Sequence, residues 1–136
     1  MATFDTSTVN WHAGHQLRAL LESVANSDFQ QHQLLRVVVV DNASSDQSAD
    51  NLEDLGLPLH LIHNEKNLGF GTACNQGASQ SSADYLIFLN PDLRLENDTL
   101  AQLITFLEEP SNSHIGFVGG KLLNESSTVI TQTYAN

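Results

Sequence analysis

Short polar side chains follow several apolar runs of this sequence, at the points where buried strands would end. Asn10 and Trp11 follow the first run, Asp41 and Asn42 the second, residues 64–71 the third, and Asn90-Pro91-Asp92 the fourth. In a parallel sheet, ligands bind at the carboxyl ends of the strands, so these residues would share one edge. One such loop is ordinary turn chemistry, because Asn, Asp, Ser and Gly are common turn residues. Four loops in phase favour a site for a polar ligand.

Asp92 is the candidate metal ligand. Pro91 ends strand pairing and stiffens the turn, which leaves the Asp92 carboxylate as a hard oxygen ligand at the sheet edge. Mg²⁺ or Mn²⁺ prefers one or two carboxylates together with phosphate oxygens and water, so one Asp and a diphosphate would meet that need. The chain carries 5 Lys and Arg against 16 Asp and Glu, a net charge of −11. A metal ion would therefore also offset the repulsion between the protein and a phosphorylated ligand.

Asp41 and Trp11 are the candidates for contact with a planar base. Asp41 directly follows the apolar run 37–40 and could accept a hydrogen bond from the N–H of an imide, as in uracil or thymine. Its alternative role is a helix cap, which other residues at 44–46 could also fill. Trp11 could be a flat wall for a base or a core residue. Gly69 and Gly71 would allow close backbone approach at a helix start, although this glycine pair alone is a weak signal.

The apolar patterns predict alternating strands and helices. Strands are expected at 3–9, 37–40, 59–63, 85–89 and 115–118, and helices at 17–24, 45–56, 69–79 and 100–107, before a Thr-rich segment at 128–134. Phe70, Ala73, Cys74 and Gly77 would share the apolar face of the third helix, and Asn97 would cap the fourth. This order predicts one α/β domain over residues 1–136, with a three-layer α/β/α arrangement and a mostly parallel sheet.

Composition argues against several classes of partner. The acidic charge disfavours nucleic acid, whose phosphates need a basic surface, and it disfavours an anionic membrane leaflet. No apolar run reaches the length of a membrane span, and no signal-peptide pattern opens the chain. Cys74 is the single cysteine, so there is no internal disulfide and a reducing compartment fits. The expected location is the cytoplasm, or the inner face of the membrane for a longer form.

Four motifs in order, VNWHAG, VVVVDNASSDQS, NLGFGTACNQGA and YLIFLNPDLRL, resemble a family 2 glycosyltransferase of the GT-A fold. Within that family they look like the rhamnosyltransferase-like branch of bacterial polysaccharide synthesis. The resemblance covers about residues 8–123. It implies an inverting transfer of a sugar from a nucleotide diphosphate sugar, such as a UDP- or dTDP-sugar, to a glycan or lipid-linked acceptor.

The resemblance also implies a role for each candidate residue. Asp41 would bind the base, beside Asn10, Trp11 and Asn42, and Asn90-x-Asp92 stands where the family has D-x-D. Asp92 would then bind the metal and diphosphate, with Asn90 near the ribose. Asn67, Gly71 and Asn75 match the loop and helix that back the nucleotide. The chain departs from the family at Ala73-Cys74-Asn75, where some members have an Arg that contacts phosphate.

Length is the largest departure from the family. Family domains continue into an acceptor half that carries the catalytic base, whereas this chain stops at Asn136. The resemblance therefore implies a truncated, donor-binding domain without its base, since Glu125 is the only acid late enough to serve. The alternative is a non-catalytic nucleotide-binding or interaction module. A flavodoxin-like or receiver-like domain is a further alternative, and Asn10-Trp11 lacks the acid cluster of a receiver.

Overall fold

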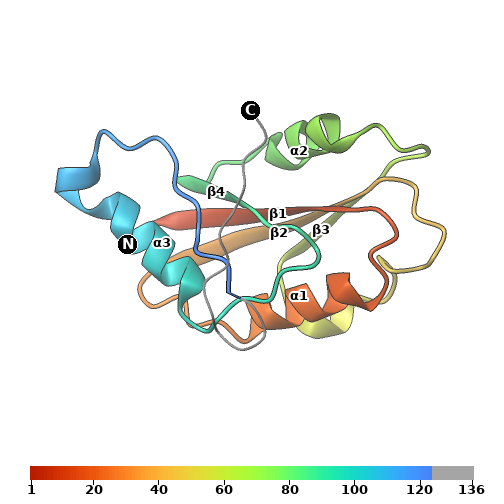
Figure 1. Cartoon of the computed structure of the whole chain (residues 1–136), viewed down its shortest axis with the longest axis horizontal. Coiled ribbons are helices and arrows are strands. Elements are labelled where there is room, and N and C mark those ends of the chain that lie inside the picture. Colours follow the sequence, from red (N-terminus) through yellow and green to blue (C-terminus); the bar gives the residue numbers. More distant parts are fainter. Residues whose placement is uncertain (124–136) are drawn as a thin grey trace.

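A computed structural model describes residues 1–123, in which four parallel strands form one sheet between two layers of helices (Figure 1). The elements are β1 (Thr3–Asn10), α1 (His15–Ala25), β2 (Gln33–Asp41), η1 (Glu53–Leu55), β3 (Leu59–His63), α2 (Phe70–Ala78), β4 (Tyr85–Phe88), α3 (Thr99–Glu108) and η2 (Pro110–Asn112). The strand order is β3-β2-β1-β4, and every pair is parallel. The three-layer α/β prediction is confirmed.

The four consecutive valines of β2 explain why helices cover both faces. Val37 and Val39 are buried in the cluster that includes Leu20 of α1 and Ile104 of α3. Val38 and Val40 are buried on the opposite face with Ala73 of α2. Successive side chains of a strand point to opposite faces, so an unbroken apolar run requires cover on each. Figure 1 shows α2 on one side of the sheet and α1 and α3 on the other.

β1 is the most polar strand and nevertheless lies inside the sheet. Its polar residues Asp5, Thr6, Ser7, Thr8 and Asn10 are each at most 1% exposed. The strand pairs with β2 along its whole length and with β4 at residues 4–7, so two backbone ladders hold it. Within residues 1–123, one side-chain oxygen of each of the five has no hydrogen-bond partner. Such groups weaken the core, so cohesion of the central strand comes chiefly from its backbone.

α2 packs closely on β1 because Gly77 faces Ser7. A Cβ atom placed on Gly77 would overlap the Ser7 hydroxyl and lie 3.1 Å from Ser7 Cβ and 3.6 Å from Val40 Cγ2. Ala73, one helical turn earlier, is fully buried on the same side. Cys74 is half-buried, and burial raises the pKa of its thiol. Phe70 was predicted on this face and is instead 61% exposed, because it begins the helix at the rim of the sheet.

Two predicted elements are wrong. The helix at 45–56 is a series of turns with only the short η1, since Asp46 accepts bonds from the backbone and hydroxyl of Ser48 and Gln47 has a positive φ. The segment 115–118 forms no strand, and Phe117 is 89% exposed. The N-cap of α3 is Asp98, one residue after Asn97, and it makes no side-chain capping bond. The Thr-rich segment at 128–134 lies outside the described residues.

Candidate functional site

Three strands end side by side at the carboxyl edge of the sheet. Asn10 of β1 is in register with Asp41 of β2, and Asp41 is in register with His63 of β3. Backbone pairing continues one step further, because Asn42 N donates to Asn10 O and Asn64 N donates to Asp41 O, each over 2.9 Å. This edge therefore places a carboxylate between an amide and an imidazole.

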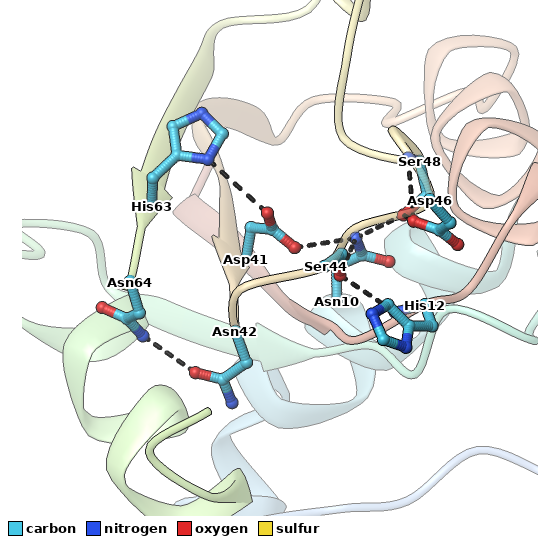
Figure 2. Close-up of polar contacts among 9 residues, drawn as sticks. All are labelled: Asn10, His12, Asp41, Asn42, Ser44, Asp46, Ser48, His63 and Asn64. Carbon is cyan, nitrogen blue, oxygen red and sulfur yellow. Dashed lines mark hydrogen bonds and ion pairs between the residues drawn. The ribbon is translucent and has the colours of Figure 1, made fainter. Parts of the chain in front are cut away.

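The Asp41 carboxylate is bounded on both sides (Figure 2). Asn10 Nδ2 donates to Oδ1 over 3.1 Å, and His63 Nδ1 lies 3.5 Å from Oδ2. Asp41 is only 6% exposed. The alternative role as a helix cap is wrong, because no α-helix follows β2 before β3. Asp41 therefore presents one oxygen, Oδ2, toward the edge of the sheet.

Asn10 joins Asp41 to the loop that follows β2. Its Nδ2 donates over 2.8 Å to Ser48 Oγ and lies 3.3 Å from Ser44 Oγ. An amide nitrogen carries two hydrogens and can donate two hydrogen bonds, so the two shorter contacts, to Ser48 and Asp41, are taken as its hydrogen bonds. Ser48 Oγ in turn donates to Asp46 Oδ1 over 2.6 Å. Asn10 is thereby fixed between two carboxylates, one bonded directly and one through a hydroxyl.

Asp46 anchors this loop to the start of α1. Its Oδ2 accepts from Gly14 N over 3.0 Å, just before the first residue of the helix. Its Oδ1 also accepts from Ser48 N. The hydrogen bond from the Ser48 hydroxyl is the main cause that lowers the pKa of the Asp46 carboxyl. A carboxylate at this position also interacts favourably with the positive end of the helix dipole.

Trp11 is a surface residue at the same edge and not part of the core. Its side chain is 58% exposed and stacks on His12, with ring centroids 5.0 Å apart and planes inclined by 23°. His12 is held by Ser44 Oγ, which accepts from His12 N over 2.9 Å, and by a contact between its Nε2 and Ser45 Oγ. The indole therefore presents one supported flat face beside the strand ends.

Asn42 and Asn67 shape the loop between β3 and α2. Asn42 is 2% exposed; its Nδ2 donates to Gly69 O, and its Oδ1 accepts from Asn64 Nδ2 over 2.9 Å. Asn67 Oδ1 accepts from Gly69 N over 2.8 Å. Gly69 has φ of 88°, a conformation that favours glycine. These amides fix the backbone at the start of α2.

The remaining predicted residues are exposed. Gly71 and Asn75 lie on α2, and Asn90 and Asp92 lie in the turn after β4, where Leu93 N donates to Asn90 O over 3.1 Å. Within residues 1–123 the Asp92 carboxylate makes no hydrogen bond or ion pair with another side chain. It fits a metal ion that takes its other ligands from phosphate and water. In the same residues no group of three or more His, Cys, Asp or Glu could hold a metal.

The structure thus joins Asn10 to Asp41 and Asn42 to the loop of Asn67, but it shows no bond between these groups and Asn90 or Asp92. Asn64 is itself held by Gln76, whose Oε1 accepts from Asn64 Nδ2 over 2.8 Å. Sequence reasoning missed several residues that hold this edge in place: Ser44, Asp46, Ser48, His63, Asn64 and Gln76. The pattern Asp46-x-Ser48 was the available signal, because Asp side chains commonly bond to the backbone two residues on. His63 was the last residue of the predicted strand 59–63, but nothing in the sequence indicated that its side chain pairs with Asp41, 22 positions away.

The sequence pattern of glycosyl transferase family 2 matches residues 8–127 of this chain. The chain belongs to glycosyl transferase family 2. The match includes every residue of the carboxyl edge described above. Family membership therefore rests on nearly the whole chain rather than on one motif.

Curated relatives of this family 2 domain carry glycosyltransferase names. An uncharacterized glycosyltransferase of Haemophilus influenzae is 28% identical over 119 residues, which is 86% of this chain and 39% of the relative. The 4,4'-diaponeurosporenoate glycosyltransferase of Staphylococcus haemolyticus is 29% identical over 93 residues, 65% of this chain and 24% of the relative. The chain thus spans well under half the length of these relatives.

Solved glycosyltransferases share the fold. S. aureus TarS 1-349 has a TM-score of 0.68 and 26% identity over 78% of this chain and 32% of its own, and it has been solved with UDP-GlcNAc. The mannosyltransferase PcManGT from Pyrobaculum calidifontis, in complex with GDP-Man and Mn²⁺, has a TM-score of 0.70 at 20% identity, over 79% of this chain and 32% of its own. The GT-A fold is therefore confirmed. Among residues 1–123, no helix is long and apolar enough to cross a membrane.

Proposed function

We propose that this family 2 domain binds a nucleotide diphosphate sugar with Mg²⁺ or Mn²⁺, as the donor-binding part of an inverting glycosyltransferase. The observation that carries the proposal is the Asp41 carboxylate. It is buried at the carboxyl edge of the sheet, with Oδ1 occupied by Asn10 and Oδ2 presented toward the edge. Ligands of open parallel sheets bind at this edge.

Asp41 recognises the base in this proposal. The N3–H of uracil or thymine donates to Oδ2, so UDP- and dTDP-sugars are the donors. A hydrogen bond to a charged group contributes about 1.5–3 kcal/mol, which corresponds to about one to two decades in affinity. Trp11 supplies a flat face for the base, supported from behind by His12. Cytosine has no hydrogen at N3, so a CDP-sugar would lack this bond.

Calorimetric titration tests the role in base recognition. Asp41→Ala is expected to lower the affinity for a UDP- or dTDP-sugar about 10- to 100-fold, while the domain still unfolds cooperatively. Asp50→Ala is the matched control, because Asp50 is an exposed acid of the same loop. Equal affinity for the CDP-sugar, or unfolding of Asp41→Ala with no separable binding defect, would give Asp41 a purely structural role.

Asp92 would hold the metal in this proposal, and the metal would supply positive charge for the diphosphate. Asn90 lies near the ribose, and Gly71 and Asn75 of α2 back the nucleotide. The ion neutralises the phosphates beside a chain of net charge −11. PcManGT, a neighbour in fold, was solved with Mn²⁺. One carboxylate makes a poor site alone, so metal and nucleotide are expected to bind together.

The metal dependence is tested by titrating nucleotide sugar with Mn²⁺ and with chelator. The wild type is expected to bind more tightly with Mn²⁺, and Asp92→Ala is expected to lose that difference. Glu96→Ala is the control, because Glu96 is an exposed acid of the same connection between β4 and α3. Equal affinity in chelator, or full Mn²⁺ dependence in Asp92→Ala, would remove Asp92 from the site.

Transfer by the 136-residue chain is a separate question. Two later acids, Glu108 and Glu109, line a cavity with Met1 and His32 at the amino end of the sheet, remote from Asp41. Glu125 lies outside the described residues. We expect this chain to bind the donor but to transfer no sugar. The acceptor of the active enzyme would be a glycan or a lipid-linked saccharide. The enzyme would be a cytoplasmic member of the rhamnosyltransferase-like branch. Turnover by this chain in a product assay, lost in Glu125→Gln, would contradict the expectation.

A further inference from the structure

We infer that His63 governs access to Asp41, because its protonated ring competes with the ligand for Oδ2. The inference rests on the proposed role of Asp41 in base recognition. His63 ends β3 directly beside Asp41, and its ring contacts the oxygen that Asn10 leaves open. Figure 2 shows His63 and Asn10 reaching Asp41 from opposite sides.

The two sides of Asp41 differ in how firmly they are held. Asn10 is fully buried and fixed by Ser48 as well as by Asp41. The His63 side chain is 59% exposed, whereas that of Asp41 is 9% exposed. Only the imidazole can therefore move aside without disturbing the core. A ligand N–H that reaches Oδ2 meets the ring there, and it must either share the oxygen with the ring or displace it.

The length of the contact makes it depend on the charge of His63. The distance of 3.5 Å between Nδ1 and Oδ2 exceeds the usual length of an N–H···O hydrogen bond, about 2.7–3.2 Å. A neutral ring at that distance offers Asp41 little, whereas an imidazolium attracts it as an ion pair. Histidine ordinarily changes charge between about pH 5 and pH 8. A protonated His63 ring would thus pair with Oδ2, and a neutral ring would leave Oδ2 available to a ligand.

The other charged groups around His63 do not reproduce this effect. Glu65 and Lys66 follow His63 in the exposed loop, and neither is paired with it in residues 1–123. Asp46, in the loop after β2, is engaged by Ser48 and Gly14. Asp41 is therefore the carboxylate with which His63 pairs in this part of the chain.

The expected effect on affinity is modest and has a defined sign. An ion pair with one exposed member contributes little, so we expect binding roughly two- to fivefold weaker when His63 is protonated. An imidazolium also attracts the diphosphate, which opposes this change. Asp41→Asn separates the two effects, because it removes the carboxylate and leaves the attraction. In that variant the pH dependence is expected to vanish or reverse.

Calorimetric titration with UDP-GlcNAc and Mn²⁺ at about pH 5.5 and about pH 8 tests the inference. The diphosphate of this probe is esterified at both ends and does not titrate in that range. The wild type is expected to bind more weakly at the lower pH, and His63→Ala and His63→Gln are expected to bind equally at both. His60→Ala is the matched control, an exposed histidine of the same strand, and should keep the wild-type dependence.

Each outcome bears on one proposal or on both. Weaker binding at low pH in wild type and His60→Ala, absent from His63→Ala, would support the inference. Binding that is independent of pH in the wild type, or equally dependent on pH in His63→Ala, would overturn it and leave the proposed function intact. Absence of UDP-GlcNAc and dTDP-sugar binding at both pH values would overturn the proposed function, and this inference with it.

Discussion

Gly77→Ala tests the close packing of α2 on β1. The added methyl group would overlap the Ser7 hydroxyl and lie 3.1 Å from Ser7 Cβ, inside the sheet where Ser7 is 1% exposed. The hydroxyl can rotate, but the Cβ atom belongs to a strand paired on both sides and cannot move freely. The helix must therefore shift outward, or the strand must bend.

Two effects of opposite sign set the magnitude. Overpacking of a buried site costs about 1–3 kcal/mol, whereas replacing Gly by Ala within a helix stabilises by about 0.8–1 kcal/mol. Because the new Cβ overlaps the Ser7 hydroxyl, the overpacking cost should lie in the upper part of its range, about 2–3 kcal/mol, which leaves a net loss of unfolding free energy of about 1–2 kcal/mol. For a domain of this length, that corresponds to a melting temperature roughly 3–8 °C lower.

Thermal and urea unfolding measure the effect, with two further variants as controls. Gly71→Ala lies on the same helix with nothing within 4 Å of its new Cβ, so it should stabilise the domain by up to about 1 kcal/mol. Ser7→Gly combined with Gly77→Ala removes the overlap and should recover part of the loss. If Gly77→Ala were as stable as the wild type, the contact between α2 and β1 would be looser than described.

Three further predictions concern charge and burial. Asp46→Asn should lower the melting temperature near pH 7. Because the hydrogen bond from Ser48 lowers the pKa of the Asp46 carboxyl, the difference in melting temperature between variant and wild type should shrink as the pH falls below the ordinary carboxyl range. Arg36→Leu removes the ion-pair partner of Asp5, which is 1% exposed, and should cost about 3 kcal/mol in urea unfolding, partly recovered by adding Asp5→Asn. Because burial raises the pKa of the Cys74 thiol, iodoacetamide should label it slowly in the folded protein and rapidly in urea.

The parts of the fold that follow from local patterns could be predicted from the sequence. The unbroken valines of β2 and the helical spacing of Leu17, Leu20, Leu21 and Val24 each determine an element by themselves. The segment 115–118 is also mostly apolar but forms no strand, because a strand also needs a partner at the correct place in the sheet. The helix expected at 45–56 failed because side-chain bonds at Asp46 replaced helical ones.

The site could be predicted only in outline. Asp41 and Asn10 were identified because each directly follows an apolar run, and parallel strands bring their ends together. The contacts that hold them come from Ser48 and His63, which no spacing rule connects to Asn10 or Asp41. The sequence did not decide whether Trp11 forms a flat wall for a base or belongs to the core. It does not reveal that His12, which has a φ of 51°, stacks on an exposed Trp11 ring.

The polar character of β1 has a consequence for how the protein is made. A ribosome synthesises β1 before both of its neighbours, and one of them, β4, comes much later. Thr3, for example, bonds to Asp84, 81 positions away. Until β4 emerges, β1 stays at the open edge of an unfinished sheet. Asp5, Ser7 and their polar neighbours on β1 resist pairing with other nascent chains better than valines would. The buried polar side chains that weaken the finished core would thus lower the tendency of the unfinished chain to aggregate.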